Sequence, residues 1–154
     1  MALAGTLEGE VEIHSPADKF FNFLVTQLHH VQNITDHVHE TKVHQGDWHS
    51  VGPDHVKHWT FTVDGKVETC REHIEEIDRE KKSITFNNFD GHVGEKYKTL
   101  KSKLEAVERG INNGAVAKWT YQYEQLHEDV PPPQAYLDFV IKTTKDIDAH
   151  LLKA

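Results

Sequence analysis

Residues 117–152, AKWTYQYEQLHEDVPPPQAYLDFVIKTTKDIDAHLL, contain the two elements that decide the fold. From Ala117 to Tyr123 apolar and polar residues alternate, which predicts a strand with one buried face. The prolines at 131–133 cannot lie inside a helix, but the last of them suits a helix start. Apolar side chains then recur every three or four positions, which predicts a helix over about 133–152. The chain therefore ends in a strand and a helix about 30 Å long.

The apolar stripe of this helix predicts which side packs on the fold. The inward residues are Tyr136, Phe139, Val140, Thr143, Thr144, Ile147 and Leu151, and those expected in water are Asp138, Lys142, Lys145 and Asp148. A long helix laid across a strongly curved sheet touches it along only part of its length. The geometry therefore predicts a hollow between helix and sheet.

Over residues 38–126, which include the strand from Ala117 to Tyr123, apolar and polar residues alternate in runs that are separated by turn residues. This pattern predicts six antiparallel strands. The turns are expected at Asp64-Gly65, Asp90-Gly91 and Asn112-Asn113-Gly114. Residues 3–13 alternate in the same way and predict a first strand. The sequence therefore favours a sheet of seven strands.

A helix is predicted to begin at Ser15-Pro16-Ala17-Asp18, with Ser15 as the capping hydroxyl and Pro16 at the first helical position. It is expected to break near His29-His30, with a second short helix reaching Thr35. The predicted order of elements is a strand, two helices, six strands and a long helix. This order is typical of the α+β fold class.

Composition limits the function classes. With 154 residues and 17.7 kDa, the chain suits one domain spanning 1–154. A net charge of −8 opposes nucleic-acid binding, and no apolar run approaches the roughly 20 residues of a membrane span. A lone Cys70 and an N-terminus without signal-peptide features predict a reducing, cytoplasmic location.

Several motifs together resemble one plant family. They are His44-Gln45-Gly46-Asp47-Trp48-His49-Ser50-Val51-Gly52-Pro53, Lys57-His58-Trp59-Thr60-Phe61, Asp64-Gly65-Lys66, Gly5-Thr6-Leu7-Glu8, Ser15-Pro16-Ala17, Tyr123-Glu124-Gln125-Leu126-His127 and Asp146-Ile147-Asp148-Ala149-His150. The chain resembles the major latex protein family, a branch of the Bet v I pathogenesis-related superfamily. This resemblance implies the helix-grip (Bet v I-like, START-like) fold, with a seven-stranded antiparallel sheet around a long C-terminal helix and an internal cavity for amphipathic or apolar molecules.

Alternation and helical spacing select the residues expected to face this cavity. They are Phe23, Trp59, Phe61, Val67, Ile84, Phe86, Leu100, Ser102, Trp119, Tyr121, Tyr123, Tyr136, Phe139, Val140 and Thr143. The residues alone favour an ordinary solid core. The resemblance favours an open cavity, and ligand pockets commonly measure about 300–1,000 Å³.

We therefore predict binding of a hydrophobic small molecule, such as a plant metabolite, hormone or lipid-like ligand, in defence or stress physiology. No cofactor is expected, and a monomer and a weak dimer both remain open. One alternative is an enzyme that isomerises or condenses metabolites in the cavity, as the superfamily relative norcoclaurine synthase does with a lysine, a tyrosine and an acid. That trio does not align here, and the best-placed titratable groups are Arg71, Glu72, His73, Tyr121 and Tyr123. A protein-interaction module is the third class.

Three other motifs favour structural interpretations. The segment Gly46 to Gly52 lacks the Gly-Lys-Ser/Thr end of a phosphate loop, so a hairpin loop near the cavity mouth is expected. Nine of the thirteen histidines lie between His14 and His58, but only His37 and His39 have a spacing that would let two donors act together. No metal site is therefore predicted. The group Lys96, Lys98, Lys101 and Lys103 is expected to be a solvated face.

Overall fold

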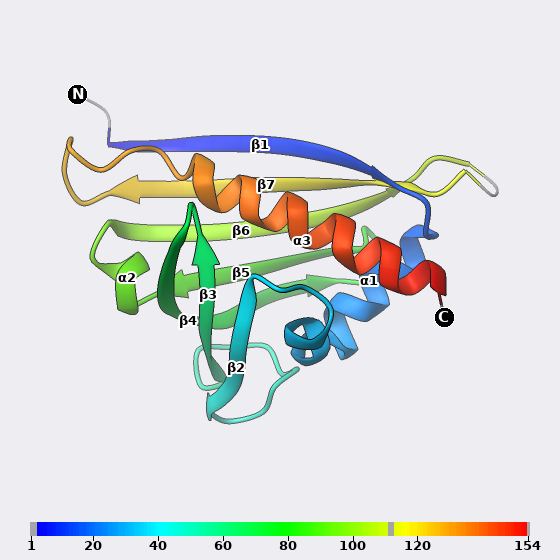
Figure 1. Ribbon diagram of the computed structural model, residues 1–154, viewed down its shortest axis with the longest axis horizontal. Helices are drawn as coiled ribbons and strands as arrows, with labels where there is room; N and C mark the ends of the chain where they lie inside the picture. Colours follow the sequence, from blue (N-terminus) through cyan, green and yellow to red (C-terminus); the bar gives the residue numbers. More distant parts are fainter. Residues whose placement is uncertain (1–2, 111–112, 154) are drawn as a thin grey trace.

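The long C-terminal helix lies obliquely across a seven-stranded antiparallel sheet in the computed structural model (Figure 1), which describes residues 3–110 and 113–153. The elements in chain order are β1 (Ala4–Ile13), α1 (Ala17–Thr26), the 3-10 helix η1 (Leu28–Asn33), β2 (Val38–Gln45), β3 (Val56–Val63), β4 (Lys66–Asp78), β5 (Ser83–Phe89), the single turn α2 (Gly91–Gly94), β6 (Tyr97–Glu108), β7 (Ala115–Gln125) and α3 (Gln134–Lys153). The predicted α+β fold class is confirmed.

The strand order is β1-β7-β6-β5-β4-β3-β2. The six later strands form the predicted meander. The first strand, β1, pairs with β7 along its whole length, from Ala4 opposite Glu124 to Ile13 opposite Ala115. The first and last strands are therefore neighbours. Because α3 is the next element after β7, the helix packs on the face of the sheet that β1 and β7 form together (Figure 1).

Gly9 lies where α3 packs on β1. A Cβ atom added at this position would lie 2.9 Å from Ile141 Cδ1 and 3.2 Å from Leu137 Cδ1. The absence of a side chain at residue 9 therefore lets the ends of the Ile141 and Leu137 side chains pack directly on the backbone of β1.

A buried carboxylate joins the β1–α1 corner to α3. Asp148 is only 6% exposed, and its two oxygens accept hydrogen bonds from the backbone N–H groups of His14 (3.0 Å) and Ser15 (2.9 Å). The prediction that Asp148 faces water is wrong, because these two N–H groups at the turn require an acceptor. Helical spacing alone does not reveal that a charged position is needed as a cap for another element.

The start of α1 also differs from the prediction. The helix begins at Ala17 with Pro16 as its N-cap residue and without a side-chain cap, while Ser15 is fully buried. Among the described residues the Ser15 hydroxyl has no hydrogen-bond partner. The capping role assigned to Ser15 is therefore wrong, and its backbone N–H is bound by Asp148 instead.

The remaining boundaries lie close to those predicted. The first helix ends at Thr26, before the histidine pair, and His29 and His30 lie in η1. The predicted turn at 112–114 lies partly outside the described residues, since it includes Asn112. In the part of the chain that the structure describes, no helix combines the length and apolar character needed to cross a membrane.

Candidate functional site: a cavity between α3 and the sheet

A cavity of about 110 Å³ lies between α3 and the concave face of the sheet and is partly open to the surface. Its walls come from the sheet and from the helices that cover it, and most of the lining side chains are apolar. The lining residues are Leu24, Leu28, Val31, Val38, Trp59, Phe61, Cys70, Glu72, Phe86, Asn88, Val93, Leu100, Ser102, Trp119, Tyr121, Tyr136, Phe139, Val140, Thr143, Thr144 and Ile147.

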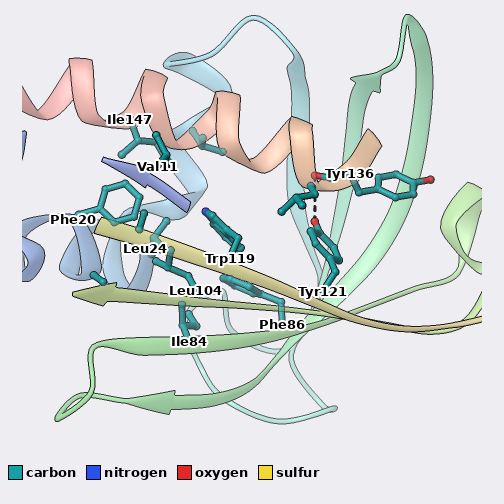
Figure 2. Close-up of a cluster of buried hydrophobic side chains, with 14 of the residues drawn as sticks. Val11, Phe20, Leu24, Ile84, Phe86, Leu104, Trp119, Tyr121, Tyr136 and Ile147 are labelled. Atoms are coloured by element: carbon teal, nitrogen blue, oxygen red, sulfur yellow. Dashed lines mark hydrogen bonds between the residues drawn. The ribbon is translucent and has the colours of Figure 1, made fainter. Parts of the chain in front are cut away.

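Most residues predicted to face the interior line this cavity. The structure brings together Trp59, Phe61, Phe86, Leu100, Ser102, Trp119, Tyr121, Tyr136, Phe139, Val140 and Thr143. Inward alternation on β6 and β7 accounts for this, because Leu100, Ser102, Trp119 and Tyr121 are all at most 6% exposed. Figure 2 shows the side chains of Trp119 and Tyr121 rising from the sheet toward α3.

Four residues predicted to face the cavity lie elsewhere. Phe23 packs near the His150 ring at 6.4 Å between centroids, and Ile84 is fully buried in the core without lining the cavity. Tyr123 lies against Tyr97, with 6.3 Å between ring centroids. Val67 is 60% exposed, because the inward positions of β4 are the even-numbered ones.

The cavity is also smaller than the 300–1,000 Å³ expected from the usual size of ligand pockets. Aromatic side chains occupy much of the hollow. The rings of Phe61 and Phe139 are 5.1 Å apart between centroids, and those of His37 and Phe139 are 4.7 Å apart. The space that remains suits a molecule of about one aromatic ring, since a cavity of about 150 Å³ holds benzene.

The polar groups in the middle of the wall are already hydrogen-bonded. The indole N–H of Trp119 donates to Thr144 Oγ1 at 2.9 Å, and the Tyr121 hydroxyl donates to the backbone carbonyl of Tyr136 at 3.5 Å (Figure 2). The Asn88 amide donates to Ser102 Oγ at 3.2 Å. Burial raises the pKa of Tyr121 well above its ordinary value, so this phenol stays protonated.

Two acids and a lysine lie on the inner face of the β3–β4 hairpin. Lys57 pairs with Glu72, and Phe61 pairs with Glu68, in the ladder between the strands. Lys57 is 1% exposed, Glu72 8% and Glu68 5%. Neighbouring strand residues paired in this way point to the same side of the sheet, so all three belong to the buried face.

At one end of the cavity, Glu68 anchors the start of α3. Its carboxylate accepts hydrogen bonds from the Tyr136 hydroxyl and from Lys96 Nζ, the latter at 2.7 Å. Burial and the neighbouring carboxylate raise the pKa of Tyr136. Glu68 is therefore fully engaged in holding α3 on β4.

At the other end, Glu72 faces the cavity, and its Oε1 atom has no hydrogen-bond partner among the residues that the structure describes. Burial raises the pKa of Glu72 to about 7, against the opposing effects of the Lys57 charge and of hydrogen bonding from the Trp59 indole toward the carboxylate. Burial also lowers the pKa of Lys57. An acid that titrates near neutrality in an apolar cavity can bind a polar ligand group or exchange a proton with it.

Sequence reasoning missed Lys57 and Glu68 as interior residues. A usable signal exists for Lys57, because it has the same strand parity as Trp59 and Phe61 in Lys57-His58-Trp59-Thr60-Phe61. Glu68 carries no such signal, since its burial depends on the partners Lys96 and Tyr136, which lie far away in the sequence. Cys70, between the two acids on this face, is a buried thiol whose pKa is raised by burial.

The two histidines considered as a pair of metal donors are engaged separately. His37 Nε2 lies 2.7 Å from Thr143 Oγ1 on α3, whereas His39 Nε2 lies 2.6 Å from Thr62 Oγ1 on β3. Across residues 3–110 and 113–153, no group of three or more His, Cys, Asp or Glu side chains is arranged to hold a metal ion. His37 instead connects the segment before β2 to α3 at the cavity wall.

Comparison with known proteins gives a consistent result. The profile of the pathogenesis-related protein Bet v 1 family matches residues 2–154. MLP-like protein 43 of Arabidopsis thaliana is 36% identical over 152 residues, covering 98% of this chain and 95% of that protein. A crystal structure of ginseng major latex-like protein 151 from Panax ginseng superposes with a TM-score of 0.88 at 35% identity, covering 97% of this chain and 98% of that one. The solution structure of an Arabidopsis thaliana member of the major latex protein family gives a TM-score of 0.70 at 32% identity, covering 99% and 96%.

Proposed function

Because the chain belongs to the pathogenesis-related protein Bet v 1 family, we propose that it binds a hydrophobic or amphipathic small molecule in the cavity between α3 and the sheet. The observation that carries this proposal is the cavity itself, a partly open hollow of about 110 Å³ whose lining is mostly apolar. Transfer of an apolar ligand surface from water into such a lining is favourable by about 25 cal/mol per Å².

The proposal includes a physiological role, a cellular compartment and a set of binding residues. The description of the family as pathogenesis-related supports a role in plant defence or stress physiology. The single, buried Cys70 needs no disulfide partner and suits a reducing compartment such as the cytoplasm. The candidate binding residues are those that line the cavity from β3, β5, β6, β7 and α3.

A cavity-filling variant tests this proposal. We expect toluene, a probe of one aromatic ring, to bind the native protein saturably with one molecule per chain. Val140 lines the cavity from α3, so Val140→Phe adds volume inside it and is expected to weaken toluene binding at least about tenfold. The measurement is a titration followed by shifts of methyl resonances from the cavity wall.

Lys145→Phe is the matched control, because Lys145 is exposed on the same helix and the added ring lies outside the cavity. This control is expected to bind toluene like the native protein. The absence of saturable binding to the native chain, or an equal loss in both variants, would contradict the proposal.

A further inference from the structure

On the inner face of the β3–β4 hairpin, at its open end, three polar atoms are buried and lack hydrogen-bond partners among the described residues. They are Lys57 Nζ, Trp59 Nε1 and Glu72 Oε1. Each belongs to the inner face of the sheet, and Trp59 and Glu72 line the cavity. A buried polar group without a partner destabilises the fold, so three of them in one place call for an explanation.

The β3–β4 ladder fixes these groups beside one another. Lys57 lies opposite Glu72, and Trp59, two residues along the same face, lies opposite Cys70. The lysine is therefore positioned next to the carboxyl group, with the indole N–H following it along β3. Together they supply two kinds of N–H donor and one carboxylate acceptor.

The loop between β2 and β3 covers this cluster, and the structure shows no hydrogen bond from the described loop residues to its three unpartnered atoms. The Trp48 ring lies over Lys57 Nζ at 5.5 Å and beside the Trp59 ring, with 5.6 Å between the two ring centroids. A cation–π contact of this kind stabilises the ammonium charge but does not satisfy its N–H groups. The loop therefore shields the cluster from water while its hydrogen-bonding capacity remains unused.

We propose that Lys57, Trp59 and Glu72 form a head-group subsite for a neutral hydroxyl group, an alcohol or phenol, carried by the cavity's ligand. The hydroxyl oxygen accepts hydrogen bonds from the Lys57 ammonium and the Trp59 indole, and the hydroxyl proton is donated to Glu72 Oε1. This inference rests on the proposed function and names the class of ligand. A carboxylate head group fits poorly, since it has no proton to donate and its charge faces that of Glu72.

Other polar groups of the wall compete weakly for such a ligand. Tyr121, Asn88 and Trp119 already donate to Tyr136 O, Ser102 Oγ and Thr144 Oγ1, respectively. A ligand hydroxyl at those places would have to displace an existing bond. At the Lys57 end it completes bonds that the protein leaves open.

A series of three probes of one ring tests the subsite: toluene, p-cresol and 4-methylbenzoate, titrated at pH 8 by calorimetry. The probes share the ring and methyl group that fit the cavity and differ only in the head group. We expect p-cresol to bind at least about tenfold more tightly than toluene, as bonds to charged groups allow, and 4-methylbenzoate to bind more weakly than p-cresol.

Trp59→Phe removes the indole donor and keeps an aromatic ring, and Glu72→Gln removes the charge and keeps the shape. Both are expected to reduce the preference for p-cresol over toluene several-fold, measured in each variant as the ratio of its own two affinities. Lys57→Met is the third variant, and Lys103→Met is its control, since Lys103 is exposed on β6. The control is expected to keep the full preference.

The outcomes separate the two proposals. Equal binding of toluene and p-cresol by the native protein would overturn the hydroxyl subsite but leave cavity binding intact. A preference for p-cresol that survives in Trp59→Phe, Glu72→Gln and Lys57→Met would also overturn it, because the hydroxyl would then be recognised elsewhere. Failure of all three probes to bind would overturn the proposed function itself.

Discussion

Glu72 shows how one residue couples stability to pH. Because burial raises its pKa from 4.5 to about 7, the folded chain retains a proton that the unfolded chain releases between these values. The stability that this proton provides is complete below about pH 4.5 and is lost as the pH rises to about 7, by at most about 3 kcal/mol. Ionised Glu72 is therefore a destabilising group kept inside the fold.

We expect Glu72→Gln to remove this pH dependence. The free energy of unfolding of the variant, relative to the native protein, should rise steadily between pH 4.5 and pH 7. Loss of the negative charge beside Lys57 shifts the whole curve, so the slope rather than the offset is the informative quantity. Urea unfolding at several pH values measures it.

Glu76→Gln is the matched control, because Glu76 lies on the same strand and is exposed. Its difference from the native protein should stay nearly constant over the same pH range. Parallel curves for Glu72→Gln and the native protein would show that Glu72 does not bind the extra proton.

At the scale of elements, α3 is both a cover for the sheet and a wall of the cavity. Phe139 belongs to the wall, is partly exposed, and packs against Phe61 and His37. Truncation of a large aromatic in a solid core costs about 3–5 kcal/mol. Beside an existing hollow, the same truncation removes fewer contacts.

We therefore expect Phe139→Ala to lose less stability than that range and to shift ligand preference toward molecules larger than one ring. Phe20→Ala is the comparison, because Phe20 is fully buried and does not line the cavity, so it should show the full loss. Denaturant unfolding and the ratio of affinities for 2-naphthol and p-cresol measure the two effects. Equal destabilisation with an unchanged affinity ratio would place Phe139 in the core.

The elements were largely predictable from the sequence, because their signals are local. The alternation of Trp119 and Tyr121 with polar residues correctly identified the inner face of β7, and the prolines before residue 134 located the start of α3. Inner residues of β4 were harder to find. Val67 is apolar but exposed, whereas Glu68 and Glu72 are charged but buried. The apolar-polar pattern therefore indicates the wrong face of β4 as the inner one at these positions.

Features that depend on distant partners could not be predicted. Asp148 is buried because it binds the backbone of residues 14 and 15, and no periodic pattern in α3 indicates this. The size of the cavity depends on how closely α3 approaches the sheet and on the rotamers of Phe61 and Phe139. Both are properties of the packed molecule rather than of any segment.

At the scale of the whole molecule, the hollow under α3 makes the volume of the folded state larger than close packing of its atoms would give. A hollow of about 110 Å³ amounts to tens of millilitres per mole, which is the size of the volume change that commonly accompanies unfolding. Water fills a mostly apolar hollow poorly, so unfolding, which removes the hollow, reduces the volume that the chain and its solvent occupy together. Hydrostatic pressure therefore acts against this fold in proportion to the space it leaves empty.

We expect high-pressure fluorescence of Trp119 and the other tryptophans to report unfolding at a lower pressure for Phe139→Ala than for the native protein, even after correction for the stability of each at ambient pressure. Saturation with toluene should raise the transition pressure by filling the hollow as well as by mass action. A volume change of unfolding that is the same for the native protein, the variant and the toluene complex would show that the space is not empty in solution. The hollow in which we propose ligand binding thus also makes the molecule compressible and sensitive to pressure.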